Sequence, residues 1–156
     1  QLNADTALKA RIARIRLAAG PLMNLGDVSA QVVPKIALLA TPRAGGHVST
    51  RSFIPHECHA SIGVFAAVSV ATACVLPGSP GARIANVPDG PVKTFSVEHP
   101  TGDFTVRLEV EGDASAPIVR RAGLVRTARK LFDGTVFVSS RAAHGWMIDA
   151  TRQAAE

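Results

Sequence analysis

The sequence predicts one α+β domain, in which a mostly antiparallel, barrel-like sheet wraps around a central apolar helix. Three observations predict it. Residues 62–76 form an apolar run without a charged side chain, in which Ser69 and Thr72 are the only polar side chains. Residues 103–111 alternate between apolar and polar side chains, which is typical of a strand with one buried face. Shorter strand patterns lie on either side of the apolar run.

The N-terminal part predicts one helix and two strands. Leu8, Ile12 and Ile15 recur at helical spacing and predict a helix over residues 5–19, which we expect to stop at Gly20-Pro21. After a loop, an apolar run at 35–40 predicts a buried strand. The glycine-containing turn that follows, residues 41–47, leads into an alternating strand at 48–54.

The apolar run at 62–76 predicts a helix that protein encloses. A helix that is apolar on every side must be buried on every side. At about 15 residues the run is shorter than the ~20 needed to span a bilayer, so we expect no membrane association. We expect His59, Ala60 and Ser61 to form its first turn. The unpaired N–H groups of a first turn attract anions, so this end of the helix predicts a carboxylate site.

The C-terminal part predicts further strands. After a Pro- and Gly-rich break at 76–81, alternation predicts a strand at 93–98 and another at 103–111, with Phe104, Val106, Leu108 and Val110 facing inward. Two more are expected at 118–126 and 135–138, with a turn at Asp133-Gly134.

Composition limits the function classes. Hydrophobic residues make up 47% of the chain and charged residues 19%, and 156 residues suffice for a core. The net charge of +5 suits acidic substrates. The basic residues are scattered and have no aromatic stacking platform, which argues against nucleic acid. We expect Arg11, Arg14 and Arg16 to lie on a solvated helix face.

The cysteines indicate a reducing compartment. If one helix holds Cys58 and Cys74, they lie about 24 Å apart and cannot form a disulfide. We therefore expect a cytoplasmic protein. Because the chain begins with Gln1 rather than Met, we expect a fragment or a processed chain.

Five motifs resemble a known family. They recur in order and together cover roughly residues 5–138. The motifs are RLAAGPLMNLGD (16–27), VPKI (33–36), FIPHECHASIG (53–63), VEHPTG (97–102) and RTARKLFDG (126–134). With these motifs the sequence resembles the C-terminal half of the 4-oxalomesaconate tautomerases, which are PrpF-like relatives of the 2-methylaconitate isomerases.

The resemblance implies a diaminopimelate-epimerase-like fold. Such enzymes have two similar domains whose central helices point their N-termini at a shared cleft. They move a proton along an allylic system of a small unsaturated tricarboxylate or dicarboxylate, without metal or organic cofactor. The resemblance also implies that the catalytic Lys and Cys come mainly from an N-terminal domain that this chain lacks. Residues 1–138 are then the C-terminal half, residues 139–156 are an atypical tail, and the missing domain is a partner, with a homo-oligomer possible in addition.

The residues before the apolar run are the first candidates for the site. Cys58 is a second acid or base, or simply a buried thiol. His59, Ala60 and Ser61 hold a carboxylate, although Ser61 also suits a helix N-cap. His56 binds the same anion or packs at the helix entry.

The preceding turn and strand supply the second group. Arginines bind carboxylates through two parallel hydrogen bonds, and glycines allow the backbone to approach a ligand closely. Gly45-Gly46 also suits a plain hairpin turn. We expect substrate contact from Arg43, His47, Ser49, Thr50 and Arg51. Met23 lies in a family-matching loop that we expect near the cleft.

Three other interpretations compete with this one. The first is a metal site at His56, Cys58 and His59, but these residues are too crowded to bind one tetrahedral ion, so we expect no metal. A hot-dog-type thioesterase or dehydratase also wraps a sheet around an apolar helix, and it needs an acidic group, here Glu57. A non-catalytic partner-binding domain is the third.

Overall fold

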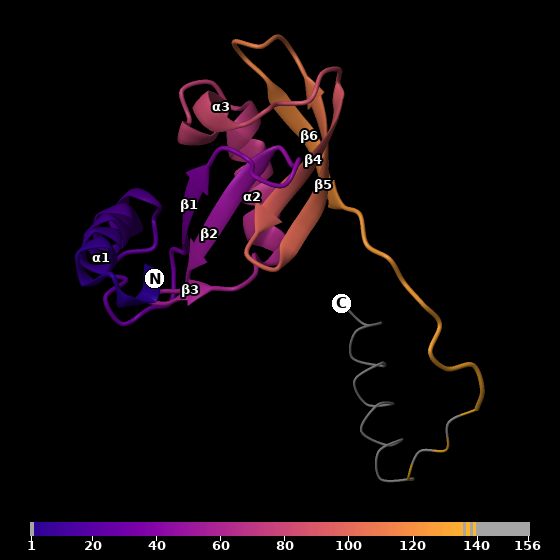
Figure 1. The fold of residues 1–156 in the computed structure, drawn as a ribbon, viewed down its shortest axis with the longest axis horizontal. Coiled ribbons are helices and arrows are strands. Elements are labelled where there is room, and N and C mark those ends of the chain that lie inside the picture. The colour runs from indigo at the N-terminus through magenta and orange to yellow at the C-terminus, as the bar shows by residue number, and fades with distance from the viewer. Residues whose placement is uncertain (1, 136, 138, 140–156) are drawn as a thin grey trace, which may run out of the picture. The chain divides into compact units, whose positions relative to one another are not determined.

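The computed structural model describes residues 2–135, 137 and 139, and it separates into two compact units, Gln1–Arg126 and Thr127–Glu156. Every helix and strand below belongs to the first unit (Figure 1). In chain order they are η1 (Leu2–Ala4), α1 (Thr6–Leu22), β1 (Ile36–Ala40), β2 (Val48–Phe53), β3 (Cys58–His59), α2 (Val64–Val75), α3 (Pro80–Ile84), β4 (Val92–His99), β5 (Gly102–Glu111) and β6 (Ile118–Leu124).

The sheet is mixed, with the order β1-β2-β4-β5-β6 and with β3 paired to β2. All neighbouring strands are antiparallel except β2 and β4. A parallel pair needs a crossover connection, which α2 and α3 supply here. Among the described strands none joins β1 to β6, so the sheet that they form is open. The structure therefore shows the α+β class, and the described strands alone do not close the expected barrel.

Alternation along the strands gives the sheet one apolar face and one polar face. Val48, Phe95, Val97, Val106 and Leu108 point to the apolar face and are completely buried. Helix α2 packs on this face with Ala67, Val70, Ala71 and Cys74 (Figure 1). The inward residues expected on β5 lie in or against this core, which confirms that prediction. The opposite face carries polar side chains such as Ser49, Arg51 and Glu98, which consequently point away from α2.

Helix α1 continues through Gly20-Pro21, so the expected stop there is wrong. Asn24 ends the helix instead, with φ of 58°, while Leu25 N–H donates to the Gly20 carbonyl at 3.0 Å and Asn24 N–H to the Pro21 carbonyl at 3.1 Å. These two bonds form a Schellman motif. Gly20 is needed for packing, because a Cβ there would lie 2.7 Å from Val28 Cγ2.

Arg16 corrects the expected solvated face of α1. Arg11 and Arg14 are exposed, but Arg16 is only 2% exposed. Its Nη1 donates to the carbonyl oxygens of Val28, Gln31 and Val33 at 2.8, 2.9 and 3.0 Å. The arginine therefore joins α1 to the loop that follows it.

Helix α2 begins at Val64, with Gly63 as its N-cap, so the expected first turn at residues 59–61 is wrong. The backbone of those residues is engaged elsewhere. Cys58 and His59 pair with Phe53 and Ser52 of β2, and the Ala60 carbonyl accepts a hydrogen bond from Thr101 Oγ1 at 3.0 Å. A segment tied to a strand in this way cannot also form the start of a helix.

Helix α2 is also not enclosed on every side. The side away from the sheet leaves Phe65 86% exposed and Val64 42% exposed. The apolar pattern predicts that the whole surface of this helix is buried, whereas among the described residues the sheet and α3 bury only part of it.

The five longer strands agree with the sequence, whereas the short helices η1 and α3 were not expected. Strands β1, β2, β4, β5 and β6 lie where alternation and apolar runs predict them, within one or two residues. Helix α3 was not expected in the break after α2, although its signal is present: Ser79 caps it by accepting from Ala82 N–H, and Pro80 follows at the first helical position. The expected strand at 135–138 and the tail at 139–156 fall largely outside the described residues.

Candidate active site

Two polar pockets lie next to each other in the first unit, at strand β2. We call the first the cysteine pocket: it has a volume of about 360 Å³ and is lined by Leu2, Asn3, Arg51, Cys58, His59, Ala60 and Pro100. The second, the loop pocket, has about 400 Å³ and is lined by Arg43, Ala44, Gly45, Gly46, Ser49, Arg51, Ser96, Glu98, His99, Pro100, Gly102 and Asp103. Arg51 and Pro100 line both pockets. Six of the expected site residues therefore meet around Arg51: Arg43, Ser49, Arg51, Cys58, His59 and Ala60.

Strand β3 and Asn3 hold Cys58 at its pocket. Cys58 is free and half-buried. Its N–H donates to Asn3 Oδ1 at 2.6 Å, and its carbonyl accepts from Asn3 Nδ2 at 3.4 Å. One asparagine side chain thus satisfies the outer edge of this two-residue strand. The thiol Sγ lies 3.9 Å from the carbonyl oxygen of His59.

Arg51 lies between the two pockets. Its neighbours Thr50 and Ser52 point to the α2 face, so alternation directs Arg51 to the polar face. Its Nη1 donates to the Thr50 carbonyl at 2.6 Å, and this is the one hydrogen bond of the Arg51 side chain within the part of the chain that the structure describes. A guanidinium carries five N–H donors in a planar fork. Most of them therefore remain for a ligand such as a carboxylate.

The loop pocket is built around Glu98 of β4, a residue the sequence reasoning did not select. Its carboxylate accepts three backbone N–H groups: Arg43 at 2.8 Å, Ala44 at 2.7 Å and Gly46 at 2.8 Å. Burial by itself would raise the pKa of Glu98. The three N–H bonds and the charge of Arg43 outweigh burial and hold its pKa below the usual value.

The structure corrects how the 41–47 loop meets an anion. Glycines there were expected to let backbone N–H groups approach a substrate. Those N–H groups instead bind the protein's own Glu98 carboxylate. Within the loop pocket, the groups left for a substrate are the side chains of Arg43, Ser49 and Arg51.

Other expected residues lie outside both pockets. His47 packs edge-on against Phe95, with ring centroids 5.7 Å apart, and its Nδ1 accepts from the Ser96 N–H at 2.9 Å. Thr50 is buried and donates to the Glu98 carbonyl at 2.7 Å. Both residues therefore support the sheet.

His56, Ser61 and Met23 are also separate from the two pockets. His56 and Ser61 lie exposed in the turns on either side of β3. Met23 lines a groove beside α2 and β1. No residue of α2 lines either polar pocket, so the expected carboxylate site at the helix N-terminus is not formed by the described residues. The part of the chain that the structure describes also contains no group of three His, Cys, Asp or Glu side chains arranged to hold a metal ion.

Several pocket residues had little or no sequence signal. Asn3 lies in a short 3-10 turn and reaches Cys58 only through tertiary contact. Asp103 begins the strand predicted at 103–111 and is not among its inward residues, yet it lines the loop pocket and accepts from Ser96 Oγ at 2.9 Å. The motif VEHPTG marks residues 97–102, but by itself it does not indicate that Glu98 binds the loop.

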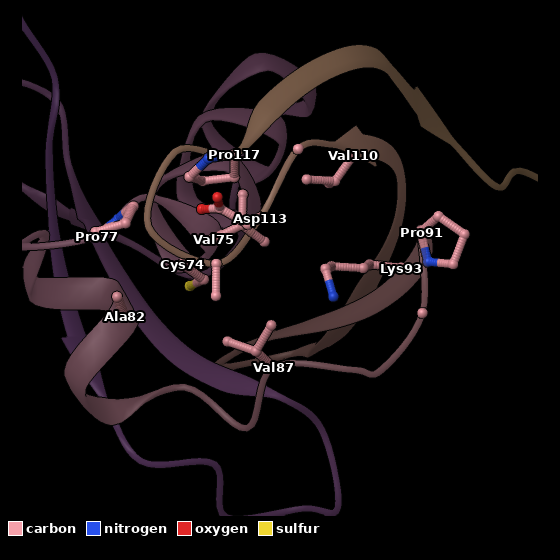
Figure 2. Close-up of a pocket in the computed structure, with 13 residues that line it drawn as sticks. Cys74, Val75, Pro77, Ala82, Val87, Pro91, Lys93, Val110, Asp113 and Pro117 are labelled. Atoms are coloured by element: carbon pink, nitrogen blue, oxygen red, sulfur yellow. The ribbon is translucent and has the colours of Figure 1, made fainter.

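A further cavity of about 640 Å³ lies at the C-terminal end of α2 (Figure 2). Cys74 and Val75 line it, and Lys93 extends into it, with Nζ donating to the Pro88 carbonyl at 2.7 Å. Desolvation raises the pKa of the Cys74 thiol to about 11. None of the expected site residues lines this cavity.

Close relatives are named for isomerisation. The chain is 60% identical over 137 residues to a (4E)-oxalomesaconate Delta-isomerase of Novosphingobium sp. (strain KA1), and 56% identical over 137 residues to a 4-oxalomesaconate tautomerase of Pseudomonas putida. Each match covers 88% of this chain, but only 38% and 37% of the respective relative. The chain therefore spans less than two fifths of the length of these relatives.

The fold also has a solved counterpart. The crystal structure of a methylitaconate-delta-isomerase matches 80% of this chain with a TM-score of 0.63 at 18% identity, and 38% of that protein is covered. At this identity the match supports the fold. Among the described residues no helix combines the length and apolarity needed to cross a membrane. The family model for PrpF protein matches residues 1–139, and the chain thus belongs to the PrpF protein family.

Proposed function

We propose that this chain is the substrate-binding C-terminal half of a cofactor-independent isomerase. The whole enzyme would interconvert keto and enol forms, or shift a double bond, in a small unsaturated tricarboxylate or dicarboxylate such as 4-oxalomesaconate. The names of the two relatives at 60% and 56% identity support this reaction class.

The observation that carries the site assignment is the position of Arg51 on both polar pockets. A planar guanidinium binds a carboxylate by two parallel, charge-assisted hydrogen bonds. A substrate with two or three carboxylates can place one in each pocket, with Arg51 between them. Arg43 and Ser49 then complete the loop pocket, and Cys58 and His59 of β3 line the cysteine pocket.

The reaction consists of two proton transfers. A base removes an acidic proton from the carbon next to the carbonyl or double bond, which leaves a dienolate. A proton is then returned to another atom of the same conjugated system, so that atoms and charge balance. Guanidinium groups at the carboxylates stabilise the negative charge of the dienolate. We assign the main acid and base to the remainder of the enzyme and propose Cys58 as an additional proton carrier.

We also propose where the remainder of the enzyme packs against this chain. A groove of about 530 Å³ runs along the outer side of β1 and α2 and is lined mainly by apolar groups, including Phe65 and Met23. Ser52 lines it too, and its buried hydroxyl has no partner among the described residues. We propose that further strands of the whole protein cover this groove and complete a barrel around α2, with a homo-oligomer as a further level of assembly. The two unpaired thiols suit a cytoplasmic location.

Family membership removes one alternative. A hot-dog-type enzyme needs an acidic residue at the start of its central helix. Glu57 is exposed, precedes β3 and pairs with Lys9 at 3.0 Å, so it is not at the start of α2. The non-catalytic alternative is decided by activity.

A chimera tests the proposal. Residues 1–139 replace the matching segment of the Pseudomonas putida tautomerase, and the conversion of 4-oxalomesaconate is followed by ultraviolet absorbance. We expect an active chimera in which Arg51→Ala lowers kcat/KM about 10- to 100-fold, because a charge-assisted carboxylate contact is lost. The control Arg121→Ala, at an exposed position on β6, should keep full activity. A folded chimera without activity would support the non-catalytic alternative, and an unaffected Arg51→Ala variant would refute the site.

A further inference from the structure

We infer that Glu98 is a positioning residue, which holds the 41–47 loop so that Arg43 faces the loop pocket. This inference rests on the proposed function in one respect, namely that the pocket receives a carboxylate. Glu98 lines the same pocket, but both of its carboxylate oxygens accept hydrogen bonds from the loop backbone.

Glu98 accepts hydrogen bonds from three of the four loop residues at positions 43–46. Oε2 accepts from the N–H of Arg43, and Oε1 accepts from those of Ala44 and Gly46, at 2.7 to 2.8 Å. The residue is 5% exposed, so water does not compete strongly for these bonds. One carboxylate therefore fixes the backbone on both sides of Gly45.

Glu98 is itself rigidly placed. It lies on β4 opposite Ser49 of β2 in the parallel pair, and its carbonyl accepts from Thr50 Oγ1 at 2.7 Å. The sheet thus provides a fixed anchor, and the loop takes its shape from that anchor.

The glycines of the loop fit this carboxylate. A Cβ at Gly46 would lie 2.7 Å from Glu98 Cγ and 2.9 Å from Oε1, so a side chain there would displace the glutamate. Gly45 has φ of 83°, a conformation that favours glycine. The loop backbone is therefore shaped to close around Glu98.

Charge alone and a positioning role predict opposite effects on anion binding when the Glu98 carboxylate is neutralised. Glu98 and Asp103 both line the loop pocket. By charge alone, neutralising either one should strengthen the binding of an anion. If Glu98 places Arg43, neutralising it should weaken anion binding, because the amide of Gln cannot accept the Arg43 N–H at the position where its NH₂ lies. The sign of the change separates positioning from charge.

The experiment uses the 156-residue chain and propane-1,2,3-tricarboxylate as the probe, with affinity measured by calorimetry at neutral pH. We expect Glu98→Gln to weaken binding about ten-fold or more, the size of one lost charge-assisted hydrogen bond. The matched control Asp103→Asn removes the same charge from the same pocket but frees no backbone N–H, and it should bind equally well or more tightly. Glu98→Asp should bind the tricarboxylate more weakly than the wild type, because its side chain is one methylene shorter and its carboxylate lies farther from the loop N–H groups.

Amide NMR of the same proteins reports the loop directly. In the wild type the N–H signals of Arg43, Ala44 and Gly46 should titrate together, with a midpoint below the usual glutamate pKa. Glu98→Gln should abolish this titration, and Asp103→Asn should preserve it.

The outcomes are distinct. If the wild type binds and Glu98→Gln binds equally or more tightly, the positioning role is refuted while the proposed function stands. Loop signals that keep their titration in Glu98→Gln refute it as well. If the wild type does not bind the tricarboxylate, the carboxylate site in the proposed function is refuted, and with it the part of this inference that concerns Arg43.

Discussion

Single residues around the site owe their roles to their surroundings more than to their type. Arg14 and Arg16 are two residues apart in the same helix, yet the first is exposed and the second is 2% exposed and bound to three carbonyl groups. Cys58 and Cys74 differ in the same way. Cys58 lies half-buried at a polar pocket, whereas Cys74 is buried in the core against Gly81 of α3.

The two thiols should therefore react at different rates. Burial raises the pKa of Cys74 to about 11, so its thiolate fraction is very small at about pH 8. With a disulfide reagent such as DTNB at that pH, we expect one fast thiol and one slow thiol per folded chain. Cys58→Ser should remove the fast phase and Cys74→Ser the slow one. A fast phase that survives in Cys58→Ser would contradict the assignment, and in denaturant both thiols should react alike.

The ends of both long helices are set by hydrogen bonds that the apolar pattern of the sequence does not include. The start of α2 is moved to Val64 because β3 pairs with β2 and Asn3 holds the outer edge of β3. The end of α1 is moved to Leu22 because Asn24 adopts a left-handed conformation. In both cases the local apolar pattern identified the helix correctly, and hydrogen bonds outside the pattern set its limits.

Substitution of Arg16 tests whether one buried side chain holds α1 to the loop at 28–33. We expect Arg16→Met to lower the free energy of unfolding by about 2–4 kcal/mol, because three carbonyl groups lose their donor. Arg14→Met, at an exposed position of the same helix, should change it by less than about 0.5 kcal/mol. Urea denaturation monitored by circular dichroism measures both. Equal stability of the two variants would show that the buried guanidinium does not hold the loop.

In the first unit, the described residues leave part of the central helix α2 exposed. The sheet protects the Ala67 and Val70 side of α2, while Phe65 remains 86% exposed beside the apolar groove. The two sheet edges also differ. Strand β1, IALLA, has no charge, whereas β6 carries exposed Arg120 and Arg121, which discourage pairing with another strand.

The exposed face predicts dye binding. The 156-residue chain should bind ANS in its folded state, because a large apolar groove is open to water. Phe65→Gln should reduce ANS fluorescence and leave the free energy of unfolding within about 0.5 kcal/mol of wild type, since the ring makes few contacts. Phe95→Gln is the contrasting variant and should unfold the chain, because Phe95 is completely buried. Unchanged fluorescence in Phe65→Gln would place the dye elsewhere.

The α+β class, the five longer strands, the central apolar helix and the family could be predicted from the sequence, because alternation, apolar runs and short motifs are local properties of the chain. The same patterns selected Arg43, Arg51, Cys58 and His59, which meet at the two pockets. The groups that shape those pockets could be identified only in the folded chain. Glu98 meets Arg43 across 55 positions, and Asn3 meets Cys58 across the same separation. Such contacts depend on how the sheet brings distant segments together, and no local pattern records that.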